Sequence, residues 1–251
     1  HTIWWEVHND FSREGVIKII LAIGGEDKTG KTTVALTFPE PIKVFEFDIA
    51  TVERAIWRFP KKDITVSQYP TPIGWGPIKS RDIKSVWDRF IDDYGAILED
   101  KGVPSLVIDT SSKCWWIGHT AYLQELQKKS PRERLLPIEY GEPNNRMASL
   151  IYGARTYNKN LVLVHHLGDV YQTILTEKGM QEMATGEKRL DGFKYTESLV
   201  DLVMYMKLDE ESKKPVGTIT LSGLALEMVG LSIAEPSYDK IVDMAKKWRG
   251  G

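Results

Sequence analysis

Cysteine is almost absent from this sequence, which contains Cys114 alone. A single thiol excludes an internal disulfide and a cysteine-based metal cluster, and it suits the reducing cytoplasm, where we expect the protein to reside. Long apolar runs are also absent, because the longest, at 17–24 and 161–164, are far too short to span a bilayer. We therefore expect no membrane contact. A net charge of −2 gives no overall nucleic-acid signature, so any DNA contact needs a local basic patch.

The residues that are present have the composition of an ordinary globular protein, with 42% hydrophobic and 27% charged side chains. Short apolar runs alternate with segments of helical spacing. This alternation predicts one α/β domain with a mainly parallel sheet flanked by helices, and ligands bound at the carboxyl ends of the strands. Strands are predicted at 16–23, 42–48, 63–69, 105–109 and 161–164, and helices at 31–38, 51–59, 83–98, 112–127 and 146–157.

The last third of the chain follows a different pattern. Residues 168–194 are polar and contain glycine, which predicts a long functional or disordered loop. Two further strands, at 199–206 and 216–221, read as an antiparallel hairpin at the edge of the sheet. An amphipathic helix is predicted at 238–248.

One motif identifies a phosphate-binding site. Residues 25–32 (Gly-Glu-Asp-Lys-Thr-Gly-Lys-Thr) match G-x-x-x-x-G-K-[ST] and lie between a buried strand and a helix, as such a loop requires. The two glycines let successive backbone N–H groups face phosphate oxygens. We therefore predict bound ATP with Mg²⁺, in which Lys31 neutralises the β- and γ-phosphates and Thr32 ligates the metal. The predicted nucleotide contacts are Gly25, Glu26, Asp27, Lys28, Thr29, Gly30, Lys31, Thr32 and Thr33.

Acidic residues at two strand ends complete the predicted catalytic site. Asp109 ends an apolar strand, where a second Mg²⁺ ligand is needed, although a helix N-cap is the alternative because Thr110 and two serines follow. Glu46 and Asp48 alternate on another strand and so share a face. Asp48 is predicted to polarise the attacking water, and Glu46 to orient or pair with Lys31. Both also fit as ordinary polar strand-end residues.

Two histidines end the strand at 161–164. Adjacent strand residues point to opposite faces, so His165 and His166 are not expected to chelate one metal ion. A polar residue at this tip is instead a candidate sensor of the γ-phosphate, which passes that state to the segment beginning at Gly168. Solvent-exposed histidines without such a role are the alternative.

The order of these motifs resembles the ATPase core of the RecA/RadA superfamily. More narrowly, 25–33, 44–48, 106–110 and 163–166 resemble the phage-type AAA nucleotide-binding proteins, which include single-strand annealing ATPases. The resemblance implies a RecA-like P-loop NTPase core with a C-terminal antiparallel edge hairpin, divided into an extension at 1–15, an ATPase domain at 16–235 and a C-terminal helix at 236–251. It also implies ATP hydrolysis coupled to recombination or annealing of single-stranded DNA, and a phage or mobile-element origin with the host cytoplasm as location.

The resemblance assigns further roles. Asp48 takes the place of a catalytic Glu with a shorter side chain, and His166 takes that of the sensor. Segments 128–134 and 168–194 correspond to loops that face single-stranded DNA, although solvated loops of mixed charge fit them too. The candidate DNA contacts are Lys128, Lys129, Arg132, Arg134, Lys188 and Arg189.

A homo-oligomeric ring or filament is also implied, in which a basic residue reaches the γ-phosphate of a neighbouring subunit. Lys213 and Lys214 are the candidates. The helix at 238–248 either forms an interface or packs on its own sheet, and packing is the favoured interpretation. Two other functions fit the sequence: a small-molecule P-loop kinase, and an ATP-gated scaffold or loader that hydrolyses slowly.

Overall fold

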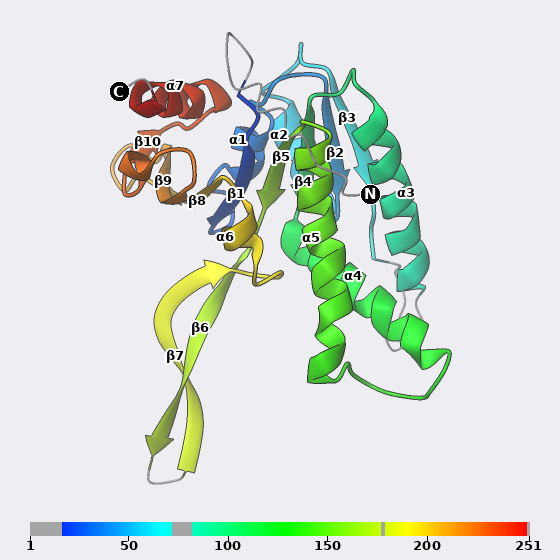
Figure 1. Ribbon diagram of the computed structural model, residues 1–251. Helices are drawn as coiled ribbons and strands as arrows, with labels where there is room; N and C mark the ends of the chain where they lie inside the picture. Colours follow the sequence, from blue (N-terminus) through cyan, green and yellow to red (C-terminus); the bar gives the residue numbers. More distant parts are fainter. Residues whose placement is uncertain (1–16, 72–81, 177–178, 250–251) are drawn as a thin grey trace, which may run out of the picture.

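The computed structural model of the protein describes residues 17–71, 82–176 and 179–249, which are organised around one large β-sheet (Figure 1). Its eight strands follow the order β10-β9-β8-β1-β5-β4-β2-β3, while β6 and β7 form a separate two-stranded sheet. The strands are β1 (Ile20–Gly25), β2 (Ile42–Glu46), β3 (Ile64–Gln68), β4 (Ser105–Asp109), β5 (Asn160–Val164), β6 (Leu167–Thr176), β7 (Gly179–Leu190), β8 (Leu202–Leu208), β9 (Pro215–Ser222) and β10 (Ser232–Ala234).

Most of the large sheet is parallel. The six neighbouring strands from β3 to β8 run in one direction, whereas β9 pairs antiparallel with β8, and β10 antiparallel with β9. Every residue of β1, β4 and β5 is buried, as expected for parallel strands covered on both faces. The predicted fold class, a mainly parallel sheet with a C-terminal antiparallel edge hairpin, is confirmed.

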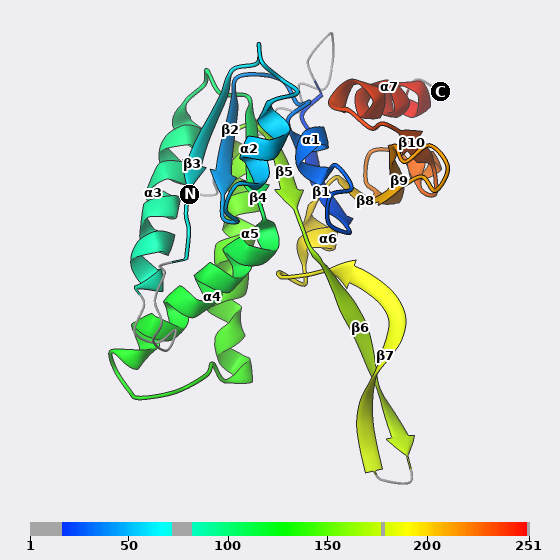
Figure 2. The same ribbon diagram turned by 180° about the vertical axis from the view of Figure 1, so that it is seen from behind.

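Helices cover the two faces of the sheet (Figures 1 and 2). On one face, α1, α2 and α7 bury apolar side chains such as Val34, Val52 and Ile241. On the other face, α3, α4 and α5 do the same with Phe90, Ile117 and Leu150. The helices are α1 (Lys31–Ala35), α2 (Thr51–Ile56), α3 (Ile83–Glu99), α4 (Ser111–Gln127), α5 (Gly141–Thr156), α6 (Thr196–Leu199) and α7 (Tyr238–Arg249), with 3-10 turns η2 (Pro137–Tyr140) and η3 (Leu226–Met228).

The C-terminal helix packs on the sheet of its own chain. Tyr238, Ile241 and Ala245 of α7 belong to the core on that face, and the Tyr238 hydroxyl donates to the Ile17 carbonyl oxygen at 2.6 Å. The apolar side of α7 is therefore already buried. This confirms the favoured interpretation, that the helix packs on its own sheet, and the expectation of an interface along that side is wrong.

The prediction of a polar loop over 168–194 is wrong. These residues form most of β6 and β7, which pair antiparallel from Leu167 and Leu190 outwards and project from the body as an arm (Figures 1 and 2). All of β7 except Leu190 is exposed and none of the described side chains of β6 is buried, so the hydrophobic alternation that marks a half-buried strand is missing from the sequence of the arm.

Smaller differences concern element boundaries. The first strand spans 20–25 rather than 16–23, and α5 begins at 141 rather than 146. The short helix α6 occupies the start of the strand predicted at 199–206, and β8 follows it. The predicted extension at 1–15 lies outside the described residues. In the part of the chain that the structure describes, none of the helices combines the length and apolar character needed to cross a membrane.

Two glycines of the helical layer differ in the space around them, which generates a stability prediction. A Cβ on Gly95 of α3 would meet no heavy atom within 4 Å, whereas one on Gly118 of α4 would lie 2.8 Å from the buried Trp87 ring. Replacement Gly95→Ala is therefore expected to raise the free energy of unfolding by about 0.5–1 kcal/mol, because alanine favours the helix. Gly118→Ala is expected to lower it by about 1–3 kcal/mol through overpacking. Urea unfolding of the two variants measures both effects; equal effects of the two substitutions would contradict the predicted close approach of α3 and α4.

Candidate nucleotide and catalytic site

The phosphate loop joins β1 to α1 and contains two glycines. Any side chain at either position would displace neighbouring atoms. At Gly25 (φ 154°) a Cβ would lie 2.5 Å from the Met206 carbonyl oxygen, and at Gly30 (φ 91°) it would lie 3.2 Å from Cγ of Pro215. Lys31 lies at the N-terminus of α1 and is buried; its ammonium donates to the carbonyl oxygens of Gly25 and Glu26, each at 2.7 Å. The loop therefore holds a cation and a helix N-terminus above the end of β1, which suits a phosphate group.

Thr32 and Asp109 meet beneath this loop. The Thr32 hydroxyl donates to Oδ2 of Asp109 at 2.6 Å, although the two residues lie 77 positions apart in the sequence. Asp109 is 1% exposed at the end of β4, and burial, reinforced by the carboxylates of Asp48 and Glu46, raises its pKa to about 6. A hydroxyl and a buried carboxyl at one point are oxygen ligands of the type that Mg²⁺ prefers, and a divalent cation there would offset the cost of the buried charge.

The alternative role of Asp109 as a helix cap does not fit the geometry. Thr110 is the N-cap of α4, and its side chain accepts a hydrogen bond from the Lys113 backbone N–H at 3.3 Å. The carboxyl group of Asp109 thus points to Thr32 rather than to the first turn of α4.

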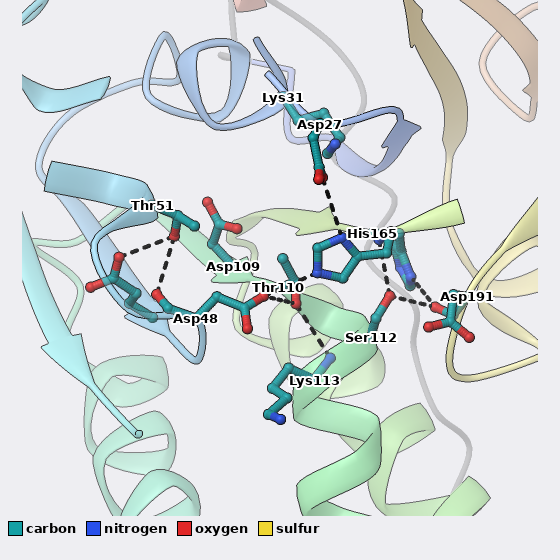
Figure 3. A network of polar contacts seen from close by, with 12 residues as sticks. Asp27, Lys31, Asp48, Thr51, Asp109, Thr110, Ser112, Lys113, His165 and Asp191 are labelled. Atoms are coloured by element: carbon teal, nitrogen blue, oxygen red, sulfur yellow. Dashed lines mark hydrogen bonds and ion pairs between the residues drawn. The ribbon is translucent and has the colours of Figure 1, made fainter. Parts of the chain in front are cut away.

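Asp48 lies beside this pair, in the turn between β2 and α2. Its Oδ2 accepts hydrogen bonds from the Thr110 hydroxyl at 2.8 Å and from Nε2 of His166 at 3.1 Å (Figure 3). The hydrogen bond from His166 lowers the pKa of Asp48, and the same contact raises the pKa of His166. Asp27 of the phosphate loop lies 4.0 Å from the other ring nitrogen. His166 therefore connects the phosphate loop with the predicted catalytic carboxylate.

Glu46 has a different position from the one predicted. Among the described residues its carboxylate accepts from the Thr51 hydroxyl at 3.0 Å, the Val52 N–H at 2.9 Å and the Gln68 amide at 2.7 Å, rather than pairing with Lys31. Thr51 and Val52 open α2, whose N-cap residue provides no side-chain cap. Glu46 thus caps α2 from inside the sheet, where the helix N-terminus favours a negative charge.

The two histidines have separate environments. His166 is partly exposed at the cavity, while His165 is fully buried, so the interpretation as two solvent-exposed histidines is wrong for His165. Burial lowers the pKa of His165 to about 4, which leaves its ring neutral at pH 7. Within the described residues, no group of three or more His, Cys, Asp or Glu is arranged to hold a metal ion.

The arm is attached to the body of the molecule through Ser112 of α4, the helix that follows β4. Its Oγ accepts from the His166 backbone N–H at 3.0 Å and donates to the Asp191 carbonyl oxygen at 2.8 Å, so it holds both ends of the arm (Figure 3). Nδ1 of His165 lies 2.9 Å from the same carbonyl oxygen. Ser112 follows Asp109 by three residues, so two hydrogen bonds join the start of α4 to the arm.

These groups line one cavity of about 610 Å³, a size typical of small-molecule sites. Sequence reasoning missed two of its charged residues, Arg54 of α2 and Arg58 in the turn after that helix. Their spacing of four residues places them on one face of a helix that follows an acidic strand end, and this signal was available in the sequence. Five cationic side chains and three carboxylates line the cavity, which favours a polyanionic ligand: Lys28, Lys31, Arg54, Arg58 and Lys213, with Asp27, Asp48 and Asp109.

The lysines predicted to act on a neighbouring subunit have contacts within the chain. Lys213 lines the cavity of its own chain, next to Pro215. Lys214 forms an ion pair with Glu235 at 3.0 Å. These positions favour contacts of both lysines within their own chain over the predicted contribution to the site of a neighbouring subunit.

The predicted DNA-contacting residues lie in two places. Four follow α4 in the chain: Lys128, Lys129 and Arg134 are exposed, whereas Arg132 is half-buried and pairs with Glu139. The other two, Lys188 and Arg189, lie near the base of the arm, where Lys188 pairs with Asp169 at 2.6 Å. The connection between α4 and α5 and the arm extend beyond the same end of the sheet (Figures 1 and 2).

Comparison with known proteins gives a family match. A family model described as an AAA domain matches residues 17–227, which is most of the chain. Among solved structures, the RadB recombinase has a TM-score of 0.44 at 12% identity over 86% of each chain. A KaiC-like protein from the hyperthermophilic archaeon Pyrococcus horikoshii OT3 has a TM-score of 0.42 at 14% identity over 82% of this chain and 79% of that chain. No match was found among the curated proteins.

The family match, the phosphate loop and the sheet define the class of the protein. This chain belongs to the AAA domain family, and its phosphate loop makes it a P-loop protein.

The contact between Asp48 and His166 generates a prediction for pH titration. The carboxylate favours the protonated ring, so the imidazolium persists to a higher pH than in a free histidine and is lost as pH rises through the raised pKa. Replacement Asp48→Asn removes the charge at nearly constant size and should lower the pKa of His166, as measured by NMR titration of the imidazole protons. His119 of α4, whose pKa burial lowers, serves as the internal control and should not move. An unchanged His166 titration in the variant would show that this contact is not formed in solution.

Proposed function

We propose that the protein binds ATP with Mg²⁺, hydrolyses it, and uses this cycle to act on single-stranded DNA in recombination or annealing as a homo-oligomer. The observation that carries the proposal is the convergence of Lys31, Thr32, Asp109 and Asp48, from three separate segments, around one cationic cavity. A triphosphate and a metal ion match this set of groups.

The phosphate loop and four side chains of the cavity have distinct proposed tasks. The loop N–H groups and the N-terminus of α1 bind phosphate oxygens, and Lys31 neutralises the charge of the β- and γ-phosphates. Thr32 and Asp109 would hold Mg²⁺, which would help to neutralise the phosphate charge when it is bound. Protonated His166 donates to the terminal phosphate and connects it through its backbone to the arm.

Asp48 is the residue placed to orient the attacking water. Its Oδ1 has no hydrogen bond to another described residue, whereas Oδ2 is held by Thr110 and His166. These hydrogen bonds lower the pKa of the carboxylate and so weaken it as a base. The same observation supports a second candidate function, an ATP-gated loader that binds the nucleotide tightly and turns it over slowly.

A DNA role is supported by the basic cluster of Lys128, Lys129 and Arg134. These exposed cations lie together in the connection that leaves α4, beyond the same end of the sheet as the nucleotide cavity. Flexible cations of this kind contact phosphates without reading sequence, which suits a protein that acts on any single strand.

The test compares the intact chain with the triple variant Lys128→Ala/Lys129→Ala/Arg134→Ala in ATP hydrolysis and in fluorescence anisotropy with a labelled single strand. Single-stranded DNA should accelerate hydrolysis by the intact chain. The triple variant should lose this acceleration but keep its basal turnover, and the slope of log affinity against log salt should fall by about 2, because each single-strand phosphate contact contributes about 0.7.

The double variant Lys246→Ala/Lys247→Ala on α7 is the matched control, since it removes exposed cations at the opposite end of the molecule. Equal DNA binding by the triple variant and the intact chain would overturn the assignment of the basic cluster. ATP binding without measurable turnover, with or without DNA, would favour the loader.

A further inference from the structure

Thr110 lies between the two carboxyl groups of the site and has contacts that its sequence position alone does not explain. It is 2% exposed and follows Asp109 directly, at the point where β4 ends and α4 is about to begin. Its hydroxyl donates to Oδ2 of Asp48 at 2.8 Å, across 62 positions of sequence (Figure 3). The same oxygen accepts from the Lys113 backbone N–H at 3.3 Å. One buried side chain therefore joins the start of α4 to the carboxylate that is proposed to orient the water.

The two contacts determine the direction of the hydroxyl proton. A threonine hydroxyl has one proton, and an ionised carboxylate can only accept, so the proton points to Asp48 while a lone pair accepts from Lys113. A length of 2.8 Å is typical of an O–H···O bond, whereas 3.3 Å is long for N–H···O. The ammonium of Lys113 lies over the Trp116 ring at 4.5 Å. The start of α4 thus contacts Asp48 through the threonine hydroxyl, and the helix cap is the weaker of the two contacts of that hydroxyl.

The position of Asp48 makes such a contact necessary. Asp48 lies beyond the end of β2, in a turn where Ala50 has a positive φ of 60°, and its side chain is 30% exposed. Its other side-chain partner, His166, holds it at 3.1 Å but is itself 46% exposed. Thr110 provides the shorter bond, and it does so from a buried residue whose branched side chain has few rotamers. The rigid side of the contact is therefore Thr110.

We propose that Thr110 is a positioning residue for hydrolysis, which holds Oδ2 of Asp48 so that Oδ1 is presented to the attacking water. Both side-chain hydrogen bonds of Asp48 among the described residues are made by Oδ2, which leaves Oδ1 for the water. Thr110 acts through Asp48, because its hydroxyl proton is already used. The inference rests on the proposed function, since it requires that Asp48 orients water.

Replacement Thr110→Val tests the role of the hydroxyl in the full chain, because valine keeps the shape of threonine and removes the hydroxyl group. With ATP and Mg²⁺, kcat should fall about tenfold or more, because the interaction that is lost orients the attacking water. KM and the calorimetric affinity for ATP should stay within about twofold, since the groups that bind the phosphates are unchanged. Thr110→Ser restores the hydroxyl and should keep kcat within about threefold of the intact chain.

The matched control separates this role from loss of a helix cap. Asp82 is the N-cap of α3 and accepts from the Ser85 backbone N–H at 3.0 Å; α3 and α4 each contain 17 residues. Asp82→Ala should lower the melting temperature as Thr110→Val does, but leave kcat unchanged. Thermal melting shows whether each variant is folded, and Thr110→Ala replaces the valine variant if valine is not accommodated.

A double-mutant cycle shows whether Thr110 acts through Asp48. Asp48→Ala removes the group that the hydroxyl holds, so adding Thr110→Val to it should have no further effect. Single-turnover hydrolysis, with protein in excess over ATP, measures the slow variants, and the double variant should match Asp48→Ala within about twofold.

Four results would overturn the inference: a valine variant as fast as the intact chain, a serine variant as slow as the valine variant, a double variant whose two losses multiply, or a valine variant that loses ATP affinity while kcat is kept. The last result would assign Thr110 to binding of the nucleotide or the metal ion. An intact chain that binds ATP without turning it over would contradict the proposed hydrolysis and this inference together, whereas normal turnover that does not depend on Thr110 would contradict this inference alone.

Discussion

The hydrogen bond between Thr32 and Asp109 is the contact on which the functional site depends. It joins the first turn of α1 to the end of β4, and β5 lies between β1 and β4 in the sheet. The contact therefore brings the phosphate loop and the carboxyl group of Asp109 together across β5, the strand that leads to His166. Without this arrangement the loop would bind phosphate, but no acidic group would lie beneath it to hold a metal ion.

The cost of burying charge explains the hydrogen-bond partners of Lys31, Glu46 and Asp109. A carboxylate or ammonium removed from water is costly unless hydrogen bonds or opposite charges compensate it. Lys31 is held by two carbonyl oxygens, Glu46 by three donors at the start of α2, and Asp109 by Thr32. Each buried charge thus fixes one element next to the cavity. The same requirement makes the site selective, because a ligand has to bring phosphate charge and a cation of its own.

The arm shows how this chemistry is connected to the rest of the molecule. Ser112 links both ends of the arm to the helix that follows Asp109, and His166 contacts the cavity on the other side. Short hydrogen bonds between neighbouring elements therefore join the start of α4 and His166 to the arm.

The sequence predicts most of the central sheet and the phosphate loop, because both depend on local patterns. Buried parallel strands are continuous apolar runs, and the loop is a fixed motif between a strand and a helix. Glu46 is different: its strand position is evident, but its partners come from α2 and β3, which only tertiary structure brings close. The arm has no buried face and hence no alternation to detect, although Val170, Tyr171 and Ile174 favour a strand. The four-residue spacing of Arg54 and Arg58 predicts that they lie on one side of a helix, but only the structure shows that both line the cavity.

Calorimetric titration of the intact chain and the Lys31→Ala variant with ATP, in the presence and absence of Mg²⁺, tests the central claim most directly. The account predicts that the intact chain binds ATP, that Mg²⁺ strengthens binding, and that loss of the Lys31 ammonium weakens it at least tenfold, or about 1.4 kcal/mol. Binding by the variant as tight as by the intact chain, or affinity independent of Mg²⁺, would contradict it.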